Sequence, residues 1–177
     1  MSTRSPFAGP SLDPSRKVTT SPQARIRTLW TRLGGSPPGR LAFSRALGIL
    51  VPYSGSIRPR VEQLAPGHAV VRLRDRRRVR NHLGSVHAIA LANLAEVTSG
   101  LAMIYALPDD ARAILVGLEV DYLRKARGTL TAECRCTPPG SAREDREMTL
   151  EAEIRDGEGD VVVRARARWR LGPVQAH

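Results

Sequence analysis

The sequence is poor in several residue types, and each shortage excludes a class of protein. Aromatic residues make up 4% of the chain, and the longest apolar stretch, around residues 86–107, contains polar side chains. A membrane-spanning helix needs roughly 20 predominantly apolar residues, so we expect no membrane span. Few aromatic rings are present to stack on bases, which argues against a protein that binds single-stranded nucleic acid.

Cysteine is scarce as well, since the chain has only Cys134 and Cys136. These two positions share one face of a strand, and a disulfide between them would be strained. We therefore expect reduced thiols and a cytoplasmic location, where thiols stay reduced. Two thiols are too few for a structural metal site, so we expect no metal and no redox cofactor.

The positive charge is unevenly distributed along the 177 residues. The net charge is 28 − 17 = +11, of which residues 1–45 contribute 8 − 1 = +7 and the rest 20 − 16 = +4. A nucleic-acid partner would therefore have to bind mainly through the N-terminal tail. Because the rest of the chain is only mildly basic, we do not expect nucleic acid as a partner.

Residues 1–23 are rich in Ser, Thr, Pro and Arg and lack hydrophobic periodicity. This composition predicts a disordered basic tail. An organelle transit peptide has a similar composition, but the prolines here break the amphipathic helix that such peptides form. A second, short tail is expected at residues 173–177.

Residues 24–52 predict a helical segment packed on the main domain. Apolar side chains recur at the helical i, i+3, i+4, i+7 spacing: Ile26, Leu29, Trp30 and Leu33. A membrane-surface helix would show the same stripe, but ten residues are short for one. A break rich in Gly and Pro at 34–39 separates this helix from a second one at 41–50.

Residues 53–172 form the predicted main domain, in which the period-two alternation of strands surrounds one long apolar helix. Two strands precede the helix and four follow it. The first of the four would place these side chains on one face: Ile114, Val116, Leu118, Val120 and Tyr122.

The side-chain pattern of the last two predicted strands indicates the register in which they pair. Pairing Ile154 with Val163 aligns apolar residues on one face and sets Glu153 against Arg164 on the other. The same register sets Glu151 against Arg166. The arginine stripe at 164–170 is therefore interpreted as one side of a set of cross-strand ion pairs.

The helix around residues 86–107 is apolar on nearly all sides, and such a helix is buried on most sides. One buried helix and six strands predict an α+β domain. In this domain a curved antiparallel sheet of about six strands wraps around the long central helix, with the helical segment as an N-terminal extension.

Glu96 lies inside this apolar helix. Burial makes an unpaired carboxylate costly and raises its pKa, which is typical of a general base or nucleophile. The alternative is a structural glutamate satisfied by Ser99 or by backbone amides. His87 is nine residues away, about 900° around a helix and roughly 13 Å along it, so the two face opposite sides. A joint site would then be composite, with His87 from one subunit and Glu96 from another.

The order of elements and one run of residues resemble a known family. Asn81, Gly84, His87 and the run Leu94-Ala95-Glu96 have the spacing of hotdog-fold acyl-CoA thioesterases, and look most like the phenylacetic-acid-degradation type and its uncharacterised relatives. Residues 122–128 also resemble a later strand and turn of that family. The element order is similar over about residues 47–171, whereas the specific motif covers about twenty positions.

The resemblance implies a homodimer, or a tetramer of two dimers, that hydrolyses acyl-CoA with coenzyme A as part of the substrate. Glu96 would activate water or attack the carbonyl carbon, and the backbone N–H of Ala88 would stabilise the oxyanion. His87 would position the thioester, and Asn81 would hold water or the loop before the helix. Two hydroxyl residues would support the glutamate: Thr98 and Ser99.

Coenzyme A carries phosphates, so basic residues near the motif are candidate ligands. The arginine run at 76–78 leads into the motif, and the individual candidates are Arg80, Arg124, Lys125 and Arg127. The alternative for each is a solvated basic loop.

Two positions depart from the family pattern, since Ala88 and Ile89 stand where those relatives have glycines. Ala88 keeps its N–H, but the added side chains narrow the path to the thioester. A second hypothesis therefore has the protein bind acyl groups or acyl-CoA without catalysis. A hotdog dehydratase with His82 and Glu96 ranks below the thioesterase, because the loop such enzymes have after the histidine is missing.

Overall fold

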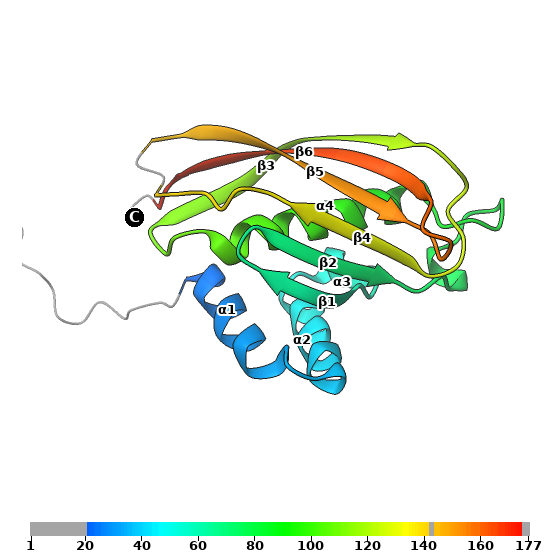
Figure 1. The fold of residues 1–177 in the computed structure, drawn as a ribbon, viewed down its shortest axis with the longest axis horizontal. Helices are drawn as coiled ribbons and strands as arrows, with labels where there is room; N and C mark the ends of the chain where they lie inside the picture. Colours follow the sequence, from blue (N-terminus) through cyan, green and yellow to red (C-terminus); the bar gives the residue numbers. More distant parts are fainter. Residues whose placement is uncertain (1–20, 142–143, 175–177) are drawn as a thin grey trace, which may run out of the picture.

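The computed structural model describes residues 21–141 and 144–174. Within these ranges the helices are α1 (Pro22–Leu33), α2 (Pro37–Leu50), α3 (Pro52–Ser56) and α4 (Ala88–Ala106), and a 3-10 turn η1 (Arg77–Val79) precedes α4. The strands are β1 (Arg60–Ala65), β2 (His68–Leu73), β3 (Ala111–Tyr122), β4 (Leu130–Arg135), β5 (Arg146–Arg155) and β6 (Val161–Pro173) (Figure 1). The expected order, two strands, one long helix and four strands, is confirmed.

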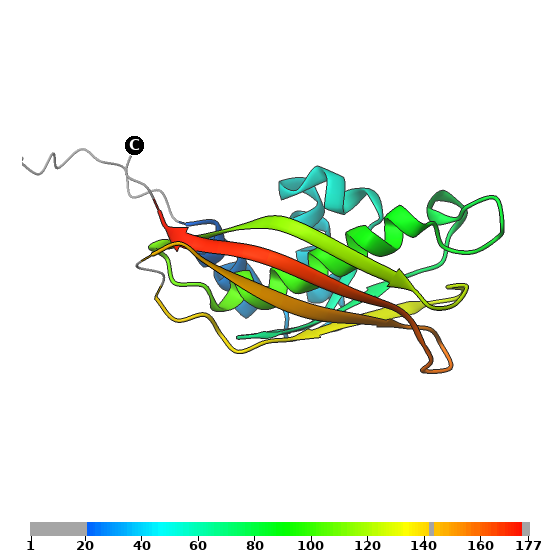
Figure 2. The same cartoon turned by 90° about the horizontal axis from the view of Figure 1, so that it is seen from above.

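The six strands form one antiparallel sheet in the order β1-β2-β4-β5-β6-β3. Helix α4 lies along this sheet, and the N-terminal helices lie beyond α4 when the molecule is viewed from above (Figure 2). By length and hydropathy alone α4 resembles a membrane span, but about two-thirds of it is buried inside the domain. Its apolar character is that of a core helix, since the sheet covers one side and α1 and α3 contact others.

The register predicted for the last hairpin is confirmed. Ile154 pairs with Val163, Glu153 with Arg164 and Glu151 with Arg166. Arg164 lies 3.1 Å from the Glu153 carboxylate, whereas Arg166 forms its ion pair with Glu119 of the neighbouring strand β3, at 3.0 Å. The arginine stripe is thus matched by carboxylates on two adjacent strands.

The face predicted for β3 is wrong in its first half. The pairing of β3 with β6 shifts between Leu115 and Gly117, which adds one residue to β3. An extra residue reverses the alternation of side chains beyond it. Ala113 and Leu115 therefore pack against the core, while Ile114 is 56% exposed. After the shift, Leu118 and Val120 contact the core as predicted.

The predicted boundary of the tail is also too late, because α1 begins at Pro22. The Ser21 hydroxyl caps the helix by accepting from the Ala24 N–H, and Pro22 suits the first helical turn. Gln23 is buried, and its amide donates to the Pro108 and Ala111 carbonyls at 2.9 and 2.8 Å. Residues 1–20 and 175–177 of the predicted tails lie outside the described residues.

The N-terminal helices pack on the domain as predicted. The apolar stripe of α1 contacts the core, and Trp30 meets Phe43 of α2 edge to face, with ring centroids 4.9 Å apart. The Ser44 hydroxyl of α2 accepts from the Val61 N–H at 2.9 Å, which ties α2 to the edge strand β1. The extension is therefore an integral wall of the domain.

Candidate active site

Helix α4 begins at a histidine cap. His87 has extended backbone angles, φ −65° and ψ 139°, and its Nδ1 accepts from the Ile89 N–H at 3.1 Å. The first helical residue is Ala88, and His87 is the N-cap residue directly before it. The histidine is exposed at the positive end of the helix, where backbone N–H groups favour developing negative charge.

Asn81 organises the loop that leads into α4. Its Oδ1 accepts from the N–H groups of Leu83 and Ser85 at 3.0 and 3.2 Å, and from the Ser85 hydroxyl at 3.2 Å. Its own N–H donates to the Ser85 carbonyl at 2.8 Å. Of the two roles expected for Asn81, these contacts correspond to holding the loop.

Glu96 is half-buried in α4 next to α3. Burial raises the pKa of the Glu96 carboxyl, and a hydrogen bond with Ser54 of α3 lowers it in part. The two hydroxyls expected to support Glu96 contact backbone carbonyls instead: Ser99 donates to that of Glu96 at 3.0 Å and Thr98 to that of Leu94 at 2.7 Å. Ser54 is absent from the sequence-based candidates. It reaches Glu96 because α3 packs on α4, and the sequence around Ser54 has no pattern that predicts this packing.

A cleft of about 560 Å³ opens beside the start of α4, between α3 and the η1 segment. Its lining includes His87 and Ile89 from the start of the helix, Asn93 one turn further on, and Tyr53 of α3. Asn93 lies three residues before Glu96, so the two share a face of α4. Glu96 itself does not line the cleft, which ends at Asn93 on that face.

Asn93 has an unsatisfied acceptor in this cleft. The residue is only 7% exposed, and its amide nitrogen donates to the Tyr53 carbonyl at 3.2 Å. Its Oδ1 is buried without a hydrogen-bond partner among the described residues. A buried polar group left unpaired costs about 1–3 kcal/mol, so a donor from water or a ligand is favourable there. Sequence analysis missed Asn93, although a polar side chain in an apolar helix is the same signal that selected Glu96.

A side chain from the sheet holds the backbone of Ala88. The Tyr122 hydroxyl, at the end of β3, donates to the Ala88 carbonyl at 3.0 Å. This contact joins the first turn of α4 to the end of β3, and burial raises the pKa of Tyr122. The N–H expected to stabilise an oxyanion therefore belongs to a well-anchored helical turn.

Two of the four predicted phosphate ligands are already engaged in ion pairs. Arg80 contacts both oxygens of Asp75, at 2.6 and 3.1 Å, and Arg124 pairs with Asp160. Asp75 also accepts from the Gly128 N–H at 3.0 Å, which docks the turn after β3 beside the motif. Lys125 and Arg127 lie exposed in that turn.

Other groups with ligand or redox chemistry have structural roles. Asp156, Glu158 and Asp160 cluster in the β5–β6 turn, but one oxygen of Asp156 accepts from the N–H groups of the other two, both at 3.0 Å. Cys134 and Cys136 are free thiols, and burial raises the pKa of Cys134 to about 12. A thiol with so high a pKa is a poor nucleophile.

A long helix held along one six-stranded antiparallel sheet is the hotdog fold, which solved structures of thioesterase-family proteins share with this chain. Within this class, the chain belongs to the family described as "Domain of unknown function (DUF4442)", whose model matches residues 39–171. The matched range starts in α2 and ends in β6. It includes the whole sheet, α4 and the cleft beside it.

Known proteins of this kind include one curated relative and several solved structures. The chain is 31% identical over 118 residues to "Putative esterase VNG_1336C" of Halobacterium salinarum, covering 63% of this chain and 78% of the relative. It matches the crystal structure of "genomics APC5556" with a TM-score of 0.73 and 29% identity, over 85% of this chain and 100% of the other. It also matches PA5026 of Pseudomonas aeruginosa, described as "Probable Thioesterase", with a TM-score of 0.63 and 22% identity, over 78% and 97% of the two chains.

Proposed function

We propose that the protein hydrolyses acyl-CoA thioesters, with Glu96 as the general base or nucleophile. The observation that carries the proposal is the half-buried carboxylate of Glu96 on α4, whose pKa is raised by burial. A base is most effective when its pKa lies close to the working pH, and burial moves a carboxyl group in that direction. The esterase and thioesterase names of the relatives support the same reaction.

In the general-base form of the reaction, Glu96 accepts a proton from water while the water oxygen bonds to the thioester carbonyl carbon. The carbonyl oxygen becomes an oxyanion, which the Ala88 N–H at the positive end of α4 would stabilise. The carbon–sulfur bond then breaks, and the CoA sulfur leaves with the proton. Because Nδ1 of His87 accepts a hydrogen bond, its neutral ring has the proton on Nε2, which stays available to hold the thioester.

We further propose that each site combines two subunits. Strand β3 is an edge of the sheet, whereas the other edge, β1, packs against α2. Large apolar side chains are exposed on β3, just after it, and around the start of α4: Ile114, Tyr122, Leu123, Leu83 and Ile89. Pairing of two copies along β3 would cover these residues and bring Glu96 of one copy toward the α4 N-terminus of the other.

The reaction is tested by measuring free CoA released from short, aromatic and long acyl-CoAs, with Glu96→Ala beside the wild type. Turnover that disappears in the variant supports the proposal and identifies the acyl class. Saturable acyl-CoA binding without turnover would overturn it in favour of a binding protein. In that case Ile89, 56% exposed at the start of the helix, is the first residue to replace with glycine.

The composite site is tested by mixing two inactive variants, His87→Ala and Glu96→Gln, after dissociation and reassembly. Random reassembly of equal amounts makes half of the dimers mixed. If each site takes its histidine and glutamate from different subunits, each mixed dimer has one intact site out of two. Activity then recovers to about a quarter of the wild-type value. No recovery, with mixed dimers confirmed by mass, would place both residues of a site in one subunit.

A further inference from the structure

A second cleft, of about 870 Å³, lies between α2 and the β1–β2 edge of the sheet, and its lining is dominated by arginines. Six border it: Arg45, Arg58, Arg60, Arg72, Arg74 and Arg76. The acidic residue in the lining is Glu62, and it is already in contact with two arginines, Arg60 at 3.1 Å and Arg40 at 3.6 Å. We call the cleft that these six residues line the arginine cleft.

The charge of the arginine cleft is unbalanced. Arg45, Arg72 and Arg74 make no ion pair and no side-chain hydrogen bond with any residue the structure describes. Arg76 donates to the Ile57 carbonyl at 2.6 Å, but its Nε is buried without a partner in the described chain. Burial and the neighbouring arginines 58, 74 and 78 lower the pKa of Arg76. Such repulsion costs free energy, and a bound anion would relieve it.

The walls of the arginine cleft are firmly held. Ser44 accepts from the Val61 N–H, and Arg40 donates to the Gly34 and Glu62 carbonyls, which fixes α2 on β1. Arg58 has φ 49°, the one positive φ among the described residues other than glycine. Backbone strain of this kind is retained where surrounding structure enforces it, often at ligand sites.

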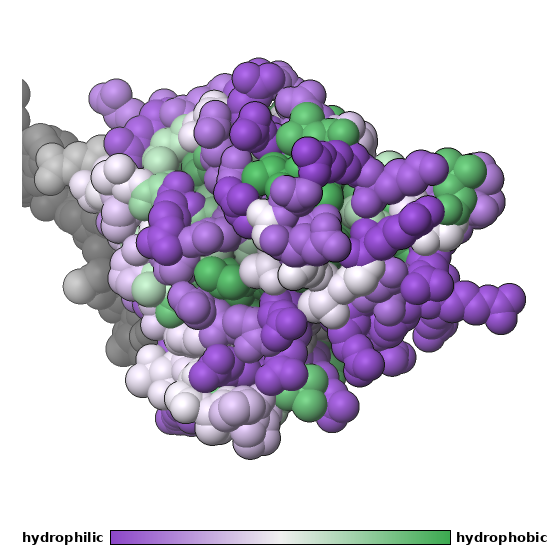
Figure 3. Space-filling view, turned by 45° about the vertical axis from the view of Figure 1, so that its right-hand side comes forward, coloured by the Kyte–Doolittle hydropathy of each residue, from purple (hydrophilic) through white to green (hydrophobic). Residues whose placement is uncertain are grey.

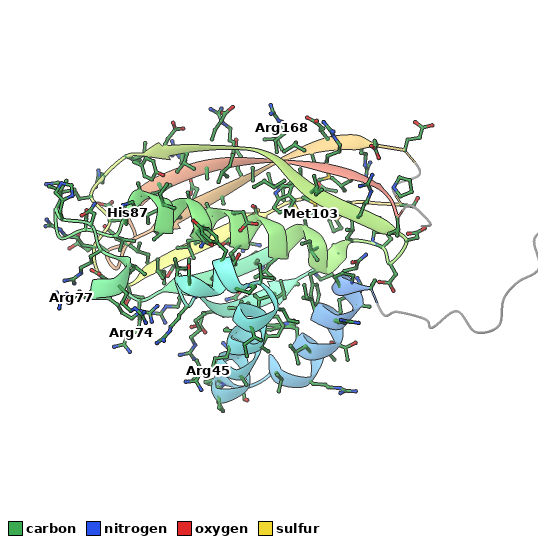
Figure 4. All side chains as sticks on the ribbon, turned by 180° about the vertical axis from the view of Figure 1, so that it is seen from behind. Arg45, Arg74, Arg77, His87, Met103 and Arg168 are labelled. Carbon is green, nitrogen blue, oxygen red and sulfur yellow. The ribbon has the colours of Figure 1, made fainter. Side chains whose placement is uncertain are left out.

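The arginine cleft is adjacent to the cleft beside α4. Gly48, Gly55 and Arg58 line both, so the two spaces meet at the α2–α3 elbow. Figure 4 shows Arg74 and Arg45 on the α2 side of the molecule, below the end of α4 that carries His87, and Arg168 beyond the sheet on the opposite side. The candidate reaction site therefore lies next to a surface rich in positive charge without carboxylate partners among the described residues.

We propose that the arginine cleft binds the phosphate groups of coenzyme A while the thioester lies beside α4. This inference rests on the proposed function and names a phosphate site other than the predicted one at Arg80, Arg124, Lys125 and Arg127. Coenzyme A has a pyrophosphate and a 3′-phosphate at one end of a long pantetheine arm, which matches two adjacent clefts of which the one further from α4 has more arginines. Guanidinium groups bind phosphate oxygens by charge-assisted hydrogen bonds.

The direct test is calorimetric titration of CoA and phosphate-free pantetheine into the wild type and an Arg45→Glu/Arg74→Glu double variant. Both side chains are exposed and outside the described hydrogen-bond network, so the fold is expected to survive. CoA affinity should fall about tenfold or more, and pantetheine affinity should not change. Arg77→Glu is the matched control, because Arg77 lies in the same arginine run but borders neither cleft.

Three results of these binding measurements would overturn the assignment. Unchanged CoA affinity in the double variant, or equal loss in Arg77→Glu, would show that the phosphates bind elsewhere or through general charge. Inorganic pyrophosphate or a short DNA duplex that binds the wild type as tightly as CoA would indicate a general polyanion surface.

Kinetics separate this inference from the proposed function. The double variant is compared with the wild type on acyl-CoA and on the matching acyl-pantetheine, which lacks the phosphates. With acyl-CoA, KM should rise about tenfold and kcat should stay the same. With the acyl-pantetheine, neither KM nor kcat should change. If the wild type hydrolyses neither substrate, the proposed reaction fails, whereas the CoA titration still decides the arginine cleft. A fall in kcat with both substrates would overturn the cleft's role as a phosphate site.

Discussion

Two surfaces of this molecule are rich in arginine, and they differ in what faces the arginines. On the outer face of the sheet, Arg164 and Arg166 pair with Glu153 and Glu119, while Arg168 and Arg170 both contact Glu147. In the arginine cleft, Arg45, Arg72 and Arg74 have no carboxylate partner among the described residues. The space-filling view shows hydrophilic side chains over most of the face it presents (Figure 3).

The difference separates charge that the protein's own carboxylates match from charge that is left unmatched and favours an anionic ligand. The outer arginines are satisfied by their own sheet, and exposed pairs of this kind contribute little, about 0–1 kcal/mol each. In the arginine cleft Glu62 pairs with Arg60, whereas Arg76 is repelled by Arg58, Arg74 and Arg78. Changes on the cleft side should therefore alter binding and catalysis, and changes on the outer face should alter stability slightly.

The largest effect is expected from Glu96→Gln. Glutamine keeps the shape of the side chain but cannot accept the proton of water, so kcat should fall by about 10²–10⁴ while the protein stays folded. Acyl-CoA hydrolysis and circular dichroism measure the two effects. Glu147→Gln on the outer face is the control and should retain full activity. Glu96→Gln with near-wild-type kcat would remove Glu96 from the mechanism.

The same variant tests the charge of Glu96 through stability. Because burial raises the pKa of Glu96 in the folded protein, its stabilising contribution is present below the ordinary glutamate pKa and is lost as pH rises through the raised value. The wild type should lose stability across that interval, and Glu96→Gln should not. Urea unfolding at a series of pH values measures the difference, and identical slopes would contradict a raised pKa.

The next effect is expected at the elbow where the two clefts meet. A side chain on Gly55 would place its Cβ 2.3 Å from the Gly48 carbonyl oxygen, so Gly55→Val must move α3 away from α2. Overpacking of this kind costs about 1–3 kcal/mol, and it should also reduce CoA binding because both glycines line both clefts. Thermal unfolding and titration measure the two losses. Gly140→Ala, where a Cβ meets nothing within 4 Å, should change neither.

A smaller effect is expected from Ser54→Ala. The Ser54 hydrogen bond lowers the pKa of Glu96, so its removal should raise that pKa further. Since the reaction needs the ionised carboxylate, the rising limb of the kcat–pH profile should move to higher pH, and kcat above the limb should be retained. Ser99→Ala is the matched control, because its hydroxyl contacts a backbone carbonyl instead of the carboxylate. An unmoved limb in Ser54→Ala would argue against Glu96 as the titrating base.

The parts predicted from the sequence are those encoded by local pattern. The apolar positions of α4 predict a core helix, and the opposed Glu153 and Arg164 predict the hairpin register together with the apolar face. Both features repeat along one element or between two neighbouring strands. The bulge between Leu115 and Gly117 has no such signal, since it depends on how β3 settles against β6.

The candidate site was predicted only in part, for a related reason. Glu96 can be selected from the sequence because it is a carboxylate inside an apolar helix. Asn81 can be selected because it belongs to the motif before that helix. Ser54 comes from a separate helix, and the arginine cleft combines residues of α2, β1, β2 and the segments beside them. Nothing in the run at 76–78 distinguishes Arg76, which lines that cleft, from Arg77, which does not. Tertiary packing alone separates them.

The smallest effect is expected on the outer face, from Glu147→Gln. The carboxylate lies 3.0 Å from Arg170 and 3.7 Å from Arg168, so its loss leaves two exposed arginines facing each other without a counter-charge. Because these groups are exposed, the free energy of unfolding should fall by about 0–1 kcal/mol, and added salt should shrink the difference by screening. Chemical unfolding at low and high salt measures this change in the free energy of unfolding. CoA affinity should not change. If Glu147→Gln weakened CoA binding as much as Arg45→Glu/Arg74→Glu, the two arginine surfaces would share one function, and the contrast between matched and unmatched charge would fail.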